Sequence, residues 1–187
     1  MNRYTISALV DNKSGVLTRV AALFARRGYN IESLSVCTTE DPTVSRMTIV
    51  LCGDDYILGQ MMKQMDKLID VRKITKVEED AVSRELLLCK VKTDATTRSQ
   101  VLEISQIFRA KIVDVSTEAT IMELTGKPSK LDGFINMLMP YGILELARTG
   151  VTSIGRGASC LRDVPDYKEQ IWRSRISFAA QNKFREE

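Results

Sequence analysis

The first apolar segment of the chain, residues 4–10, alternates between apolar and polar side chains, a pattern that predicts a strand. The apolar residues that follow are three and four positions apart and predict a helix packed against a sheet. The stripe on this helix consists of Val16, Val20, Leu23, Phe24 and Arg27. We expect Ser14 or Asn12 to cap the helix at its start and Gly28 to end it.

The same two patterns continue as far as residue 77. Strands are predicted over residues 31–37, 47–51 and 71–77, with a polar, proline-containing turn at 39–43. A second helix precedes the last strand, and its apolar stripe consists of Ile57, Met61, Met62, Met65, Leu68 and Ile69. The order is βαββαβ, which gives a four-stranded antiparallel sheet with both helices on one face.

This order recurs in the second half of the chain. The expected strands are residues 85–91, 112–117, 120–124 and 143–148. The two helical stripes are Val101, Ile104, Ile107 and Phe108, and then Leu131, Phe134, Ile135 and Leu138, ending near Pro140 and Gly142. We therefore predict an α+β protein with two ferredoxin-like βαββαβ domains.

A constant offset between matching residues supports two copies of one unit. The same number of positions separates Arg3 from Arg84 and Val10 from Val91, and it also separates Ile31 from Ile112. The helices align only with a small shift. The alternative is one continuous α+β domain.

Domain boundaries follow from a short acidic stretch, residues 78–83, and from a change in sequence character near residue 150. The expected parts are a first domain over 1–79, a second domain over 84–152 and a C-terminal tail over 153–187. Within the tail, residues 154–159 are loop-like, whereas 167–184 have the pattern of a helix carrying Ile171, Trp172, Ile176 and Phe178. Two alternatives are open: the tail packs on the second domain, or it serves as an arm that binds a partner.

Composition argues against several classes of protein. The chain has 187 residues, of which 44% are hydrophobic, and no apolar run is long enough to span a membrane. It starts without the apolar segment of a signal peptide. The net charge of +3 is small and basic residues are interspersed with acidic ones, so the sequence shows no basic cluster that would indicate binding of nucleic acid. RNA-binding RRM domains share the order βαββαβ, but they stack bases on aromatic residues of the central strands. Here those strands hold one aromatic residue, Tyr4.

Reactive side chains are sparse. The chain contains no histidine, the commonest general base and zinc ligand. The four cysteines are Cys37, Cys52, Cys89 and Cys160. Their wide spacing favours buried free thiols in a reducing cytoplasm over disulfides, a metal carrier or an iron–sulfur site. The methionines are typical of core filler rather than metal ligands. No nucleophile motif or P-loop indicates an enzyme.

The most distinctive stretch lies at the entrance to the first helix, residues 11–17. A helix N-terminus offers unpaired amides and the positive end of the dipole, which together suit a carboxylate. Gly15 permits close approach of the backbone, and the side-chain oxygens of Asn12 and Asn30 are acceptors for an ammonium group. These features predict a sensor of free amino acids. Each residue also has a simpler interpretation, since Asn12, Ser14, Gly15 and Asn30 are all typical of turns and caps.

Three segments, residues 15–19, 23–34 and 41–48, closely resemble the small, regulatory subunit of acetolactate synthase (acetohydroxyacid synthase). The resemblance extends over roughly residues 2–157. It implies an N-terminal ACT domain, the amino-acid-sensing form of βαββαβ, followed by a second ACT-like domain. It further implies a non-catalytic homodimer that stimulates a separate large catalytic subunit and makes it sensitive to feedback inhibition by valine. Thiamine diphosphate, magnesium and FAD are then expected on the catalytic subunit, and no cofactor on this chain.

The resemblance also implies a valine site between two N-terminal domains. The matching positions are Asn12, Gly15, Val16 and Leu17 of one subunit, with Asn30 and Ile31 of the other. The amides of Val16 and Leu17 would hold the carboxylate of valine. The corresponding loop of the second repeat, residues 92–99, has no glycine, so we expect it not to bind valine in this way. The alternative is an ACT-type amino-acid sensor that serves another biosynthetic enzyme. The sequence does not rank valine above leucine or isoleucine.

Overall fold

The structure is a computed structural model that describes residues 2–167, 169 and 170. The chain divides into two compact units. The first unit contains the described residues up to Ala81 and again those from Ser153 onward, whereas the second unit contains Val82–Thr152.

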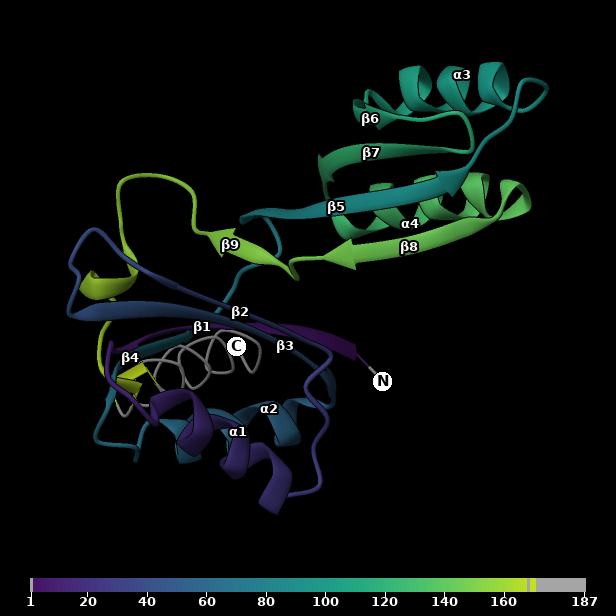
Figure 1. Cartoon of the computed structure of the whole chain (residues 1–187). Helices are drawn as coiled ribbons and strands as arrows, with labels where there is room; N and C mark the ends of the chain where they lie inside the picture. The colour runs from purple at the N-terminus through teal and green to yellow at the C-terminus, as the bar shows by residue number, and fades with distance from the viewer. Residues whose placement is uncertain (1, 168, 171–187) are drawn as a thin grey trace, which may run out of the picture. The chain divides into compact units, whose positions relative to one another are not determined.

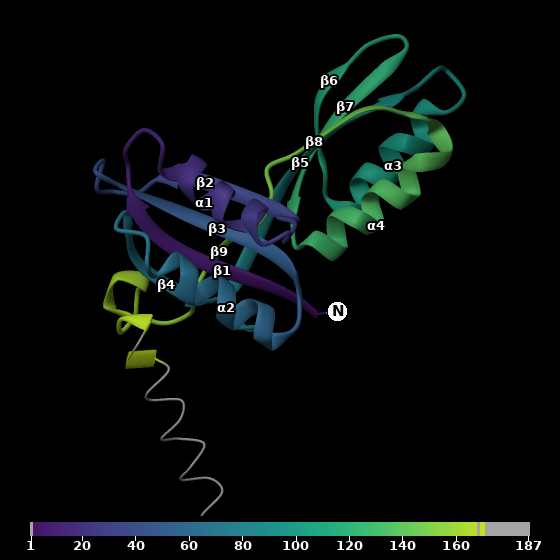
Figure 2. The same cartoon turned by 90° about the horizontal axis from the view of Figure 1, so that it is seen from below.

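The first unit is a four-stranded sheet with two helices. Its elements are β1 (Asn2–Asp11), α1 (Val16–Arg26), β2 (Ser33–Thr38), β3 (Val44–Gly53), α2 (Asp55–Met65) and β4 (Val71–Lys76). The strand order is β2-β3-β1-β4, and all neighbours are antiparallel. Both helices cover the same face of the sheet (Figure 1). In the view from below, α1 lies on the β2–β3 side and α2 on the β1–β4 side (Figure 2).

The core of this unit lies between the sheet and the helices. The inward residues of β1 alternate as expected, and Ile6, Ala8 and Val10 have no exposed surface. Two residues of the expected helical stripes are not part of this buried core. Arg27 is exposed because it caps the C-terminus of α1. Ile69 is 96% exposed because α2 already ends at Met65 and the chain turns before β4.

The second unit repeats the same architecture. Its elements are β5 (Val82–Lys92), α3 (Arg98–Phe108), β6 (Lys111–Val115), β7 (Ala119–Gly126), α4 (Pro128–Leu138), the 3-10 helix η1 (Met139–Tyr141) and β8 (Ile143–Arg148). The strand order is β6-β7-β5-β8, which matches the first unit strand for strand. Phe108 and Phe134 pack with ring centroids 5.3 Å apart. Ile107, expected on the buried face of α3, is instead 69% exposed.

The two units share one irregularity of pairing. In the first unit the register of β1 against β4 shifts between Leu9 and Val10. In the second unit the register of β5 against β8 shifts between Lys90 and Val91, the positions that the sequence offset pairs with them. A β-bulge is a built feature of a strand rather than a random defect. The structure therefore confirms the predicted fold class, two βαββαβ units with antiparallel sheets.

After β8 the chain returns to the first unit through β9 (Thr152–Ile154), a loop and the 3-10 helix η2 (Leu161–Asp163). Tyr167 is 8% exposed and belongs to the core cluster of the first unit. Lys73 Nζ pairs with Asp166 at 2.6 Å, and Gln170 Nε2 donates to the Ile74 carbonyl at 3.0 Å. The described part of the tail thus packs on the first unit, which neither expectation included. Most of the helix expected over 167–184, including Ile171, Trp172, Ile176 and Phe178, lies outside the described residues.

All four cysteines are free, but only one is buried. Burial raises the pKa of the Cys89 thiol to about 11. Cys37, Cys52 and Cys160 are exposed, so the expectation of buried thiols is wrong for these three. Within residues 2–167, 169 and 170, no three metal-binding side chains gather at one point, and no helix has the length and apolar character to cross a membrane.

Candidate functional site

Hydrogen bonds to two other segments of the chain hold the start of the loop between β1 and α1. The amide of Asp11 donates to the Asp70 carbonyl at 2.8 Å, and the amide of Asn12 donates to the Thr43 carbonyl at 2.7 Å. The side-chain nitrogen of Asn12 donates to the Pro42 carbonyl at 2.8 Å. This bond uses the nitrogen end of the exposed side-chain amide, so the oxygen end is the acceptor that remains.

Gly15 is the N-cap of α1 and has φ +82°, a conformation that a residue with a Cβ rarely adopts. No side chain caps this helix, so the expectation that Ser14 or Asn12 would do so is wrong. The amide of Val16 makes a long bond to the Lys13 carbonyl at 3.4 Å, and no described side chain takes up the other amides of the first turn. A Cβ at Gly15 would lie 3.3 Å from Nη1 of Arg19, whose Nε pairs with Asp70 at 2.7 Å.

Val16 and Leu17 differ in which of their atoms a ligand can reach. The side chain of Val16 is 3% exposed and lies in the core, so only its backbone faces the loop. Leu17 is 45% exposed, which leaves its side chain open to contact. The arrangement offers main-chain donors beside one exposed apolar side chain.

Asn30 and Ile31 lie beyond the other end of α1. Gly28, with φ +68°, follows the C-cap Arg27 and ends the helix as expected. Asn30 is exposed, and Ile31 packs partly against the core. The second strand begins at Ser33 rather than at Ile31. An eleven-residue helix separates these residues from Gly15 by about 16 Å. One chain therefore does not bring the six predicted site residues together.

The equivalent loop of the second unit carries its own carboxylate. The offset between the repeats pairs Gly15 and Val16 with Thr96 and Thr97. The amides of these threonines donate to Oδ1 of Asp94 at 2.8 and 2.9 Å, and both hydroxyls contact the same oxygen. These bonds, led by the Thr96 hydroxyl, hold the pKa of Asp94 far below its usual range. Sequence reasoning missed this aspartate, although Asp followed by threonines is a recognised signal of a local turn.

We expect Asp94→Ala to lower the melting temperature of the protein at neutral pH, because four loop donors lose their acceptor. A folded pKa below the unfolded value, about 3.9, means that the stabilisation is complete above that value. It is lost as the pH falls through the folded pKa. Thermal unfolding of the wild type and the variant should show a constant difference above about pH 5 that shrinks in acid. Asp114→Ala, on exposed β6, is the control and should have little effect at pH 7. A difference that grows in acid would contradict this role.

Comparisons with known proteins cover both units. Residues 6–73 match the family model of the AHAS small subunit-like ACT domain, and residues 84–157 match that of the small subunit of acetolactate synthase. The chain is 55% identical over 155 residues to the acetolactate synthase small subunit of Mycolicibacterium smegmatis, covering 82% of this chain and 91% of the relative. It is 50% identical over 155 residues to the probable acetolactate synthase small subunit of Archaeoglobus fulgidus, covering 83% and 98%.

A solved structure shows the same fold. The acetolactate synthase small subunit from Thermotoga maritima is 41% identical, with a TM-score of 0.79, and the match covers 85% of this chain and all of that one. The family models reach residue 157 and do not extend to η2.

Proposed function

Because the chain belongs to the family of acetolactate synthase small subunits, we propose that it stimulates the large catalytic subunit of that enzyme and confers feedback inhibition by valine. The family makes the chain a regulatory component of branched-chain amino acid biosynthesis. In this proposal the chain acts in the cytoplasm as a homodimer. Thiamine diphosphate, magnesium and FAD reside on the catalytic subunit, and this chain needs no cofactor of its own.

The contrast between the two loops is the observation that carries the valine site. The first loop ends in Gly15, a left-handed N-cap of α1, whereas the second loop has no glycine and its last two amides before α3, those of Thr96 and Thr97, are bonded to Asp94. An internal carboxylate thus binds backbone amides beside the start of α3, and the bonds of the first loop among the described residues include no such carboxylate beside the start of α1. This supports one amino-acid site per chain. A dimer should therefore bind two valines, and calorimetry that counts four would contradict it.

A dimer built through β2 would complete the site. β2 is an edge strand, with β3 as its neighbour in the described sheet. Antiparallel pairing of two β2 strands about a two-fold axis covers this edge. Because α1 lies on the β2 side of the sheet (Figure 2), the two α1 helices would then run side by side in opposite directions. The N-terminus of one α1 would meet the residues that follow the other, including Asn30.

Valine would bridge this interface through both of its charges. Its carboxylate would accept from the amides of Val16 and Leu17 at the positive end of the helix dipole. Its ammonium group would donate to the side-chain oxygens of Asn12 and of Asn30 from the second copy. The branched side chain would lie against Leu17 and Ile31. Binding that favours one dimer arrangement by about 1–3 kcal/mol is enough for several-fold inhibition.

Acetolactate formation by the catalytic subunit tests the proposal directly. The assay compares the catalytic subunit alone, with this chain, and with this chain plus valine, leucine or isoleucine. We expect stimulation by the chain and inhibition that is strongest with valine. Turnover of pyruvate by this chain alone would contradict the regulatory role. Co-purification with the catalytic subunit of a different pathway would favour the alternative, an ACT-type sensor of another biosynthetic enzyme.

Asn30→Ala should weaken valine binding about tenfold, because one acceptor for a charged donor is lost. Stimulation of the catalytic subunit should be retained, since Asn30 is exposed and outside the core. Calorimetry with valine and the acetolactate assay measure the two effects separately. Asn136→Ala, an exposed asparagine on α4, is the matched control and should change neither. Loss of stimulation together with valine binding would point instead to a broken dimer.

A further inference from the structure

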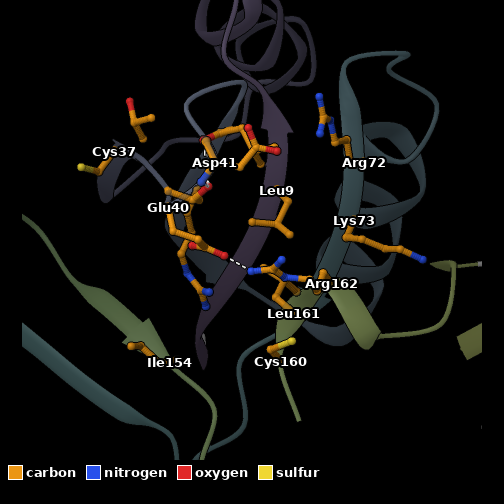
Figure 3. A pocket seen from close by; sticks show the side chains of 14 residues that line it. Leu9, Cys37, Glu40, Asp41, Arg72, Lys73, Ile154, Cys160, Leu161 and Arg162 are labelled. Atoms are coloured by element: carbon orange, nitrogen blue, oxygen red, sulfur yellow. Dashed lines mark hydrogen bonds and ion pairs between the residues drawn. The ribbon is translucent and has the colours of Figure 1, made fainter. Parts of the chain in front are cut away.

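The face of the first sheet that is turned away from α1 and α2 carries a pocket with a volume of about 580 Å³ (Figure 3). One cross-strand row lines its floor. Arg46 of β3 is paired in register with Cys37 of β2 and with Leu9 of β1, and Leu9 is paired with Lys73 of β4. Small-molecule pockets typically measure about 300–1,000 Å³. The size therefore suits a compact organic ligand.

Arg46 is the unusual member of this row. Its Nη2 donates to the Ser153 carbonyl at 2.7 Å and to the Ser7 hydroxyl at 3.3 Å. Its Nε is enclosed and has no hydrogen-bond partner among the described residues. Both of its acceptors are neutral, and burial lowers the pKa of the guanidinium. A partly buried cation without a counter-charge is costly, and an anion nearby would relieve that cost.

Other cationic side chains of this protein are paired with carboxylates. Arg148 in the second unit pairs with Glu85 at 2.7 Å and with Asp132 at 2.8 Å. In the pocket itself, the three other cations each have a carboxylate. These pairs are Arg72 with Asp11, Lys73 with Asp166, and Arg162 with Glu40. Among the described residues that line the pocket, Arg46 is the cation that lacks an anion.

We propose that this pocket binds a small organic carboxylate with a short hydrocarbon chain. The carboxylate would be held at Arg46. The hydrocarbon chain would lie against Leu9 and Val44 from the sheet and Leu161 from η2, all of which line the pocket. The contact with Arg46 needs no ammonium group on the ligand. Of the two acids that line the pocket, Glu40 is paired with Arg162, and Asp41 accepts through Oδ1 from the amide and hydroxyl of Thr43. The site is separate from the proposed valine site.

The C-terminal segment forms one wall of this pocket. Figure 3 shows Leu161, Arg162 and Cys160 on the side facing Leu9, with a dashed line joining Arg162 to Glu40. Both partners of that ion pair are largely exposed, so the pair contributes little to stability. Since the family models stop at residue 157, the pocket depends on residues that lie beyond them.

Titration with 4-methylpentanoate, followed by methyl NMR of the full chain, tests the proposal. This probe has a carboxylate and a branched hydrocarbon chain but no ammonium group. It therefore cannot make the contacts with Asn12 and Asn30 that are proposed for valine. We expect saturable shifts of the methyl signals of Leu9, Val44, Ile154 and Leu161. Arg46→Gln should weaken binding about tenfold or more, because a charged contact is lost. Ile154→Trp fills the pocket from an exposed position and should weaken binding in a protein whose Arg46 is intact.

Two variants serve as controls. Arg26→Gln removes a cation from the exposed end of α1, outside the pocket, and should leave the affinity unchanged. Gly15→Asp alters the proposed valine site and should also leave it unchanged, so failure of one site is distinguishable from failure of the other. Equal affinity in wild type, Arg46→Gln and Ile154→Trp, or no binding to wild type, would overturn the proposal. Competition by sulfate as strong as that by the carboxylate would overturn the role of the hydrocarbon chain.

Discussion

Gly15→Asp is expected to abolish inhibition by valine while leaving stimulation of the catalytic subunit in place. Two effects act in the same direction. A side chain at φ +82° costs about 1 kcal/mol relative to glycine, so the loop would shift. The new carboxylate would also lie beside the amides proposed to hold the carboxylate of valine and would repel it. The valine concentration for half-inhibition should rise by well over about tenfold.

Gly157 provides a matched control for this substitution. It has φ +80° and open space around its Cβ position, so Gly157→Asp introduces a similar strain and the same charge in another loop, the one that follows β9. Gly15→Ala separates the two effects at Gly15 itself, since it adds the strain without the charge. We expect inhibition curves for the three variants to show the largest loss for Gly15→Asp, a smaller one for Gly15→Ala and none for Gly157→Asp. A normal valine response in Gly15→Asp would contradict the assigned site.

Tyr167→Ala is expected to lower the free energy of unfolding by about 3 kcal/mol, an effect typical of removing a buried aromatic ring. Tyr167 lies in the core cluster of the first unit, and its hydroxyl donates to the Gly59 carbonyl at 3.2 Å. This hydrogen bond would be lost and the core would contain a cavity. Chemical denaturation monitored by circular dichroism measures the change.

Two substitutions define the origin of that loss. Tyr56→Ala removes a tyrosine that is 70% exposed on α2 and should cost little. Tyr167→Phe keeps the ring and removes only the hydrogen bond, so it should cost about 1 kcal/mol. Equal stability of Tyr167→Ala and wild type would show that the segment after η2 is not part of this core.

Most of the fold was predictable because its signals are local. Alternation placed β1, and helical spacing placed the buried faces of α1 and α4. The repeat offset, found between single residues, also marks the shared β-bulge at Val10 and Val91. Errors occurred at the ends of elements. Ile69 continues the spacing of α2 but lies after the helix has ended, so helical spacing no longer predicts which residues are buried.

The candidate sites were less predictable, because they depend on contacts between distant segments. Gly15 was recognised as a loop glycine, but that it caps α1 itself, with no side-chain cap, is visible only in three dimensions. Asn12 resembles a cap, yet its side chain bonds to Pro42. The contact of Arg46 with the Ser153 carbonyl joins residues more than a hundred positions apart. No pattern along the chain indicates that Arg46 lacks a carboxylate partner.

The placement of Tyr167 has a consequence for the order in which the protein matures on the ribosome. The first eighty or so residues leave the exit tunnel early, but their core receives this ring only after the second unit has been made. The contact of Tyr167 with Gly59 spans most of the chain, and such distant contacts slow folding. The first unit should therefore emerge as a loosened intermediate that a chaperone can bind, and it should gain its full resistance to proteases only near the end of translation.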